Sequence, residues 1–214
     1  MYNYIVIEGN IGAGKTTLAT AMAADLNTRL VLEQFADNPF LPKFYEDPEK
    51  HAFPLELSFL AERYHQLKKE LSNQDLFKPA IISDYYFVKS LIFAKSNLKE
   101  DEFALYSKLF HIINDSLPKP DLFVFLYHDI ERLQENIKKR GRSYEQNIPN
   151  DYLIKIQHAY FDFFKQLTDL RILVLDVNNV DFANNPKDYE LILDILKKPY
   201  NAGITSITVK NNAG

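Results

Sequence analysis

Residues 9–16 have the types and the spacing needed to bind phosphate groups. Their sequence, GNIGAGKT, matches the pattern G-x-x-x-x-G-K-[ST] in full. Glycines let the backbone turn so that consecutive N–H groups face inward, and a helix that starts here adds partial positive charge. Lys15 is placed to reach the outer phosphates of ATP, and the hydroxyl of Thr16 is placed to bind Mg²⁺. The predicted ATP contacts are Gly9, Asn10, Ile11, Gly12, Ala13, Gly14, Lys15, Thr16 and Thr17.

This match is specific for so short a run. A chance match is expected on the order of once in a hundred chains of this length. The chain has only six glycines, and positions 9, 12 and 14 of the motif hold three of them. The motif therefore predicts binding of a nucleoside triphosphate. It does not identify the group that accepts the phosphate, and water remains one of the candidates.

Two acidic residues, Glu33 and Asp84, each end a short apolar run that is typical of a strand. Side chains at the carboxyl end of a parallel strand face the crevice in which ligands bind. A carboxylate there is suited to take a proton from a primary hydroxyl, which is the role predicted for Glu33. For Asp84 we expect binding of Mg²⁺, directly or through water. The alternatives are an exposed acid at the start of a loop for Glu33 and a helix N-cap for Asp84.

Basic residues cluster in residues 138–146, KKRGRSYEQ. Because this segment contains a glycine and follows an expected helix, it is typical of a mobile lid, which we assign to residues 138–148. Arg140 and Arg142 would close over the triphosphate and neutralise the charge that develops during transfer. The alternative is a solvated basic helix end, which the helix dipole favours.

The elements that must position these residues alternate between strand-like and helix-like patterns. Strands are expected at residues 2–8, 29–33, 80–84, 122–127 and 171–176. Helices are expected at residues 16–26, 53–71, 87–95, 101–117, 130–139, 150–168 and 186–197. The alternation predicts an α/β, three-layer P-loop fold with a five-stranded parallel sheet flanked by helices. Residues 38–49 carry three prolines and are expected to be irregular, and residues 204–209 are either an edge strand or part of a loose tail, 199–214.

The composition indicates a single domain of 214 residues, with 46% hydrophobic and 25% charged residues. No apolar run reaches the roughly 20 residues that span a bilayer, and the first residues lack the features of a signal peptide. There are no cysteines, which weakly favours the cytoplasm. The net charge of −4 argues against a general nucleic-acid binder. The five histidines are scattered and predict no metal site.

Together these motifs resemble the deoxynucleoside kinase family, P-loop enzymes that phosphorylate the 5′-hydroxyl of deoxynucleosides. The resemblance runs from the phosphate loop to about residue 182. Residues 83–98 favour the bacterial deoxyguanosine and deoxyadenosine kinases within that family. The resemblance implies a purine deoxynucleoside substrate, ATP and Mg²⁺ as cofactors, a homodimer, and a role in nucleotide salvage. It also implies that Glu33 is the base and that Arg140 and Arg142 are lid arginines.

The resemblance extends to the acceptor side of the site. It implies that Tyr45 and Glu145 bind the sugar 3′-hydroxyl, and that Glu56, Arg63 and Phe93 surround the base. The ordinary alternatives are a core position for Phe93 and a solvated helix stripe for Glu56 and Arg63.

Three positions depart from the family pattern. Glu56 stands where the family has Gln; it would either accept from the two donors of a guanine edge or pair with Arg63. Tyr85 replaces an Arg that contacts the reacting hydroxyl, and Lys89, one helical turn later, would supply the missing charge. Asn136 stands where some members have a further Arg.

Two other functions share these features. A nucleoside monophosphate kinase such as a thymidylate kinase has the same architecture, but it needs cations for the acceptor phosphate. The segment after Glu33 has none until Lys43. A regulatory nucleotide-binding protein would have little use for Lys15, Glu33, Asp84 and the lid arginines together.

Overall fold

The structure is a computed structural model that describes residues 2–34, 38–72 and 80–210. Within these ranges six strands form one parallel sheet with the order β2-β3-β1-β4-β5-β6. The strands are β1 (Tyr4–Gly9), β2 (Arg29–Val31), β3 (Ile81–Ser83), β4 (Leu122–Tyr127), β5 (Arg171–Asp176) and β6 (Gly203–Thr208). The connection from β1 runs outward to β2, whereas the connection from β3 crosses β1 to reach β4. This change of direction creates a crevice at the carboxyl ends of β1 and β3.

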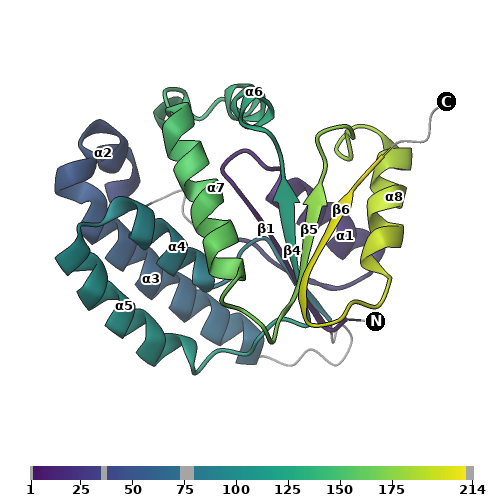
Figure 1. Cartoon of the computed structure of the whole chain (residues 1–214), viewed down its shortest axis with the longest axis horizontal. Coiled ribbons are helices and arrows are strands. Elements are labelled where there is room, and N and C mark those ends of the chain that lie inside the picture. The colour runs from purple at the N-terminus through teal and green to yellow at the C-terminus, as the bar shows by residue number, and fades with distance from the viewer. Residues whose placement is uncertain (1, 35–37, 73–79, 211–214) are drawn as a thin grey trace.

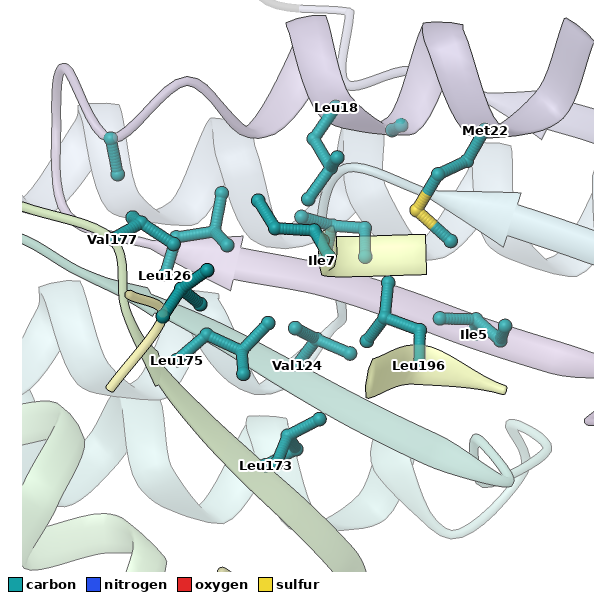
Figure 2. Packing of buried hydrophobic residues seen from close by; sticks show 14 of the residues in the cluster. Ile5, Ile7, Leu18, Met22, Val124, Leu126, Leu173, Leu175, Val177 and Leu196 are labelled. Atoms are coloured by element: carbon teal, nitrogen blue, oxygen red, sulfur yellow. The ribbon is translucent and has the colours of Figure 1, made fainter. Parts of the chain in front are cut away.

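Alternate residues of the central strands face opposite layers of helices, as the two-residue period of a strand requires. One face buries Ile7, Val124 and Leu175 against Leu18 and Met22 of α1 (Lys15–Asp25). Leu196 of α8 (Pro186–Leu196) joins the same cluster (Figure 2). This layer fixes α1, and with it the loop between β1 and α1, against the sheet.

The other face packs against a cluster that is rich in aromatic side chains. Phe125 of β4 packs against Tyr160 and Phe164 of α7 (Asn150–Phe164), with ring centroids 4.9 and 5.3 Å apart. The same cluster includes residues of α4 (Val88–Asn97) and α5 (Glu100–Asn114). Figure 1 shows α3, α4, α5 and α7 on one side of the sheet and α1 and α8 on the other. Helices therefore cover both faces, as the sequence predicts.

The expectation that residues 38–49 are irregular was wrong. They form α2 (Phe40–Glu46) and the start of α3 (Pro48–Ser72). Pro42 is the third residue of α2 and Pro48 is the first residue of α3, and proline is tolerated in a first helical turn because those N–H groups have no partner within the helix. The prolines thus mark where two helices begin.

The sheet differs from the prediction at both edges. The sixth strand, β6, pairs parallel with β5 from Arg171↔Gly203 to Asp176↔Thr208. Its pattern is weak because alternate residues, such as Ile204, face solvent. At the other edge β2 ends at Val31, so Glu33 follows the strand instead of ending it. Residues 211–214 of the predicted tail lie outside the described residues.

Helix α6 (Ile130–Arg140) follows strand β4 in the chain, and a 3₁₀ turn (Ser143–Glu145) follows α6. These two elements carry the predicted lid. No helix in the described ranges is both long and apolar enough to cross a membrane.

Candidate active site

A cavity of about 650 Å³ opens at the carboxyl ends of the strands. It is lined by the loop after β1, by the residues that follow β2 and β3, and by side chains from α2, α3, α4 and the predicted lid. Its lining includes the predicted site residues Ile11, Gly12, Ala13, Gly14, Lys15, Thr16, Thr17, Glu33, Tyr45, Glu56, Arg63, Asp84, Lys89, Phe93, Arg140, Arg142 and Glu145. The fold therefore brings residues from Ile11 to Glu145 into one site. Gly9 and Asn10 are buried at the end of β1, outside this lining.

The shape of the phosphate loop depends on two glycines. Gly12 and Gly14 both have φ of +82°, a conformation that other residues rarely adopt. A Cβ atom at Gly12 would lie 2.8 Å from the carbonyl oxygen of Leu133, and one at Gly14 would lie 2.9 Å from the ring of Phe182. Asn136 donates to the carbonyl of Gly12 at 2.9 Å. Where some family members have an arginine, this chain thus uses an amide to hold the loop.

Lys15 lies inside the loop with its ammonium group held by the loop's own backbone. Its Nζ donates to the carbonyls of Gly9 at 3.0 Å and Asn10 at 2.9 Å. Burial lowers the pKa of Lys15 to about 8, and repulsion from Lys89 acts in the same direction. Lys15 therefore loses its proton more easily than an exposed lysine does, and an anionic ligand would raise its pKa again.

Asp84 connects the phosphate loop to the segment after β2. Its Oδ2 accepts from the hydroxyl of Thr16 at 2.5 Å, and its Oδ1 accepts from the backbone N–H of Glu33 at 2.7 Å. The N-cap of α4 is Phe87, so the alternative of Asp84 as a helix cap was wrong. A hydroxyl and a carboxylate that converge at the mouth of a phosphate loop are oxygen donors of the kind that Mg²⁺ prefers.

Glu33 lies between two cations. Its side chain is only 5% exposed, and its two oxygens accept from Arg63 Nε at 2.7 Å and Lys89 Nζ at 2.5 Å. Burial acts to raise the pKa of Glu33, but Lys89 and Arg63 outweigh it and lower the pKa to about 2. The carboxylate is therefore ionised at any physiological pH. The alternative of an exposed loop acid was wrong.

Lys89 supplies one of the two positive charges next to Glu33, and Arg63 supplies the other. Tyr85, at the position of the family arginine, is fully buried and donates its hydroxyl to Gln66 at 2.8 Å. Lys89 also lies 5.6 Å from the ring centre of Phe93, which extends along the same face of α4.

Glu56 and Arg63 point into the protein, so the alternative of a solvated stripe was wrong. They are 1% and 4% exposed. Arg63 donates to Glu33 and, through Nη1, to Ser90 at 2.9 Å. Glu56 accepts from Asn97 Nδ2 at 2.6 Å. The hydrogen bonds of Arg63 thus go to Glu33 and Ser90. The alternative in which Glu56 pairs with Arg63 was wrong, because the carboxyl group of Glu56 bonds to Asn97 instead.

The predicted lid lies over α2. Arg140 and Arg142 both form ion pairs with Glu145, the second at 3.3 Å. The ring of Tyr144 stacks on that of Tyr45 with the centroids 5.8 Å apart. Burial raises the pKa of Tyr45, and Glu145 adds to the effect, so its hydroxyl stays protonated. Tyr45 and Glu145 therefore face the same end of the cavity.

A sequence model described as deoxynucleoside kinase matches residues 5–199 of the chain. The chain belongs to the deoxynucleoside kinase family. Its fold and the clustering of phosphate loop, carboxylates and arginines agree with this membership.

Individual members of the family are similar over almost the whole chain. A deoxyguanosine kinase of Bacillus subtilis is 37% identical, over 91% of this chain and 96% of its own length. A deoxyadenosine kinase of Dictyostelium discoideum is 32% identical, over 92% of this chain and 79% of its own. The solved structure of deoxyadenosine kinase from M. mycoides with bound dATP has a TM-score of 0.78 at 27% identity, and it covers 91% of this chain and 100% of that one.

Some residues of this deoxynucleoside kinase site were missed by reasoning from the sequence. Asn97 lies four residues after Phe93 and eight after Lys89, so a helical period on α4 would have indicated it. His128 and Arg132 follow β4 and line the cavity near the phosphate loop. Burial lowers the pKa of His128 to about 4, and Arg132 acts in the same direction. No spacing in the sequence connects these two residues to the site.

We expect Gly12→Ala to weaken ATP binding by about tenfold or more, because a strained backbone position costs about 1–3 kcal/mol and the new Cβ would displace the loop from Leu133. Titration calorimetry with MgATP measures the change. Gly203→Ala is the matched control: its φ is +102°, and a Cβ there meets nothing within 4 Å. It should reduce stability without changing ATP affinity. An unchanged affinity in Gly12→Ala would contradict the assigned loop.

Proposed function

We propose that this family member transfers the γ-phosphate of ATP to the 5′-hydroxyl of a purine deoxynucleoside. The observation that carries the proposal is the ionised Glu33, held by Lys89 and Arg63 in the cavity that the phosphate loop lines. The purine class is supported by the relatives named deoxyguanosine and deoxyadenosine kinase. The 5′-monophosphate would enter nucleotide salvage.

On the donor side, the N–H groups of residues 9–17 and the ammonium of Lys15 would bind the phosphates of ATP. Thr16 and Asp84 would hold Mg²⁺, and their oxygens already converge in the structure. When bound, Mg²⁺ supplies neutralisation of the charge on the β- and γ-phosphates. Arg140 and Arg142 would move from Glu145 to the transferred group when the lid closes.

On the acceptor side, Glu33 accepts the proton of the 5′-hydroxyl while the hydroxyl oxygen bonds to the γ-phosphorus. The bond between this phosphorus and the β–γ bridging oxygen breaks, and ADP leaves with that oxygen. A pKa of about 2 makes Glu33 a weak base for an unreacted alcohol. In a loose transition state the proton leaves late, when bonding to phosphorus has made the oxygen acidic, so a weak base suffices.

The rest of the cavity would recognise the nucleoside. Tyr45 and Glu145 lie together and would bind the 3′-hydroxyl, while Glu56, Arg63 and Phe93 would surround the base. We further propose a single-domain protein that acts as a homodimer in the cytoplasm, where ATP is available. The dimer is supported by exposed apolar residues on one face of α5, namely Leu105, Leu109 and Ile112.

Acceptor-dependent release of ADP tests the proposed activity. We expect turnover with deoxyguanosine or deoxyadenosine, and little with their 5′-monophosphates, when each is mixed with MgATP and ADP is measured by a coupled assay. Turnover with monophosphates alone would indicate a nucleoside monophosphate kinase. ADP release that no acceptor stimulates would indicate a regulatory nucleotide-binding protein.

Replacing Glu33 with Gln tests the base. We expect Glu33→Gln to lower kcat by about 10²–10⁴-fold, because general-base catalysis contributes roughly that factor, while ATP binding is kept. Glu46→Gln, on the exposed surface of α2, is the matched control and should keep the activity of the unmodified protein. Near-normal turnover in a folded Glu33→Gln protein would remove Glu33 from the base role.

A further inference from the structure

The carboxyl group of Glu56 is buried in the cavity, and one of its two oxygens has no hydrogen-bond partner in the described residues. The residue is 1% exposed and lies on α3. Its Oε1 accepts from Asn97, at 2.6 Å, whereas its Oε2 has no hydrogen-bond partner among residues 2–34, 38–72 and 80–210. A buried oxygen without a partner destabilises the folded protein, so such groups in folded proteins usually have a function. Because Glu56 lines the cavity, a molecule bound there could reach this oxygen.

Ionisable groups of α3, α4, α5, α7 and the segment after β2 act on the carboxyl group of Glu56. They are Arg63 of α3, Lys89 of α4, Glu33 after β2, Tyr106 of α5 and Tyr152 of α7. Burial raises the pKa of Glu56 to about 7, although Arg63, the bond from Asn97 and Lys89 each act to lower it. Both cations form their ion pairs with Glu33, so they stabilise the carboxylate of Glu33 more than that of Glu56. Glu56 is therefore present in both its ionised and its neutral form near neutral pH.

We propose that the carboxyl group of Glu56 selects the purine base: as a carboxylate it binds guanine, and as a neutral acid it binds adenine. This inference rests on the proposed function. It adds that the protonation state of Glu56 determines which of two purine deoxynucleosides the site prefers.

The hydrogen-bonding patterns of the two bases carry the proposal. An ionised carboxylate only accepts, whereas a protonated one donates once and still accepts. The pairing edge of guanine presents two adjacent donors, N1–H and the N2 amino group, which match two carboxylate oxygens. Adenine presents a donor, the N6 amino group, next to an acceptor, N1. The N1 lone pair of adenine would face an oxygen of ionised Glu56 with no proton between them. Because a site with unpaired polar groups binds a ligand poorly, the ionised form should reject adenine.

The geometry leaves room for this pairing. Each carboxylate oxygen can accept two hydrogen bonds, so the bond from Asn97 leaves Oε1 one position and leaves Oε2 both. The bond also fixes the orientation of the carboxyl group. Phe93, one turn before Asn97 on α4, lines the same cavity and offers its ring to the face of the base.

The ratio of kcat/KM for deoxyguanosine to that for deoxyadenosine tests the proposal. If each base requires a different protonation state of one carboxyl group, the ratio rises with pH by up to about tenfold per pH unit. We expect a rise of at least about tenfold between pH 6 and pH 8, around the raised pKa. The titrations of Glu33, Lys15 and ATP act equally on both substrates, so they cancel in the ratio.

Two variants and one substrate analogue test whether the pH dependence comes from Glu56. Glu56→Gln places a fixed donor and a fixed acceptor at this position, so its ratio should not change with pH and should shift toward deoxyadenosine. Glu62→Gln is the matched control on the exposed face of the same helix and should keep the original ratio and its slope. Deoxyinosine, which lacks the N2 amino group, should fall below deoxyguanosine because it loses one hydrogen bond to Glu56.

The outcomes separate this inference from the proposed function. A ratio that stays flat in the unmodified protein, or a Glu56→Gln protein that keeps the original slope, would overturn the role of Glu56 while the kinase activity stands. Phosphorylation of neither purine would overturn both. If Glu56→Gln does not fold, the pH dependence of the ratio in the unmodified protein still decides.

Discussion

The ion cluster of Glu33, Lys89 and Arg63 is the interaction on which the rest of the site depends. All three side chains are less than 10% exposed, and removing one partner from such a group leaves a buried charge without compensation. The cluster joins three segments that are distant in the chain: the residues after β2, α3 and α4. Through the backbone of Glu33 it reaches Asp84, and through Asp84 it reaches Thr16. A continuous set of polar contacts therefore connects the phosphate loop to the cavity wall that carries Glu56.

This arrangement gives two carboxyl groups in one cavity opposite properties. Glu33 receives both cations, and its pKa falls to about 2. Glu56 lies in the same wall, but its direct partner is the neutral amide of Asn97, so burial dominates and its pKa rises to about 7. Separation of pKa values by environment is a general way in which a site assigns different roles to two similar groups. Here it leaves one carboxylate permanently charged and the other responsive to pH.

The sequence was informative wherever a function depends on local geometry. The phosphate loop is a strand, a turn and a helix in succession, and the bounds predicted for β4 and β5 are those observed. The rule that strand ends form the crevice located Glu33 and Asp84. The prediction of secondary structure failed at residues 38–49, where prolines begin helices. It also left β6 undecided, because the half-exposed side chains of that strand weaken its pattern. The polar face of α3 was ambiguous because a cavity and bulk solvent select the same residue types.

The ionisation of Glu33 is the central claim, and its side-chain carboxyl carbon reports it directly. Protein labelled with ¹³C at the glutamate carboxyl groups would be titrated by NMR, and the Glu33 signal assigned as the one absent from Glu33→Gln. We expect this signal to stay at the position of a carboxylate down to about pH 4, and to titrate at higher pH in Lys89→Met, which lacks one of the two cations. A midpoint at or above the ordinary glutamate value of about 4.3 in the unmodified protein would contradict the account.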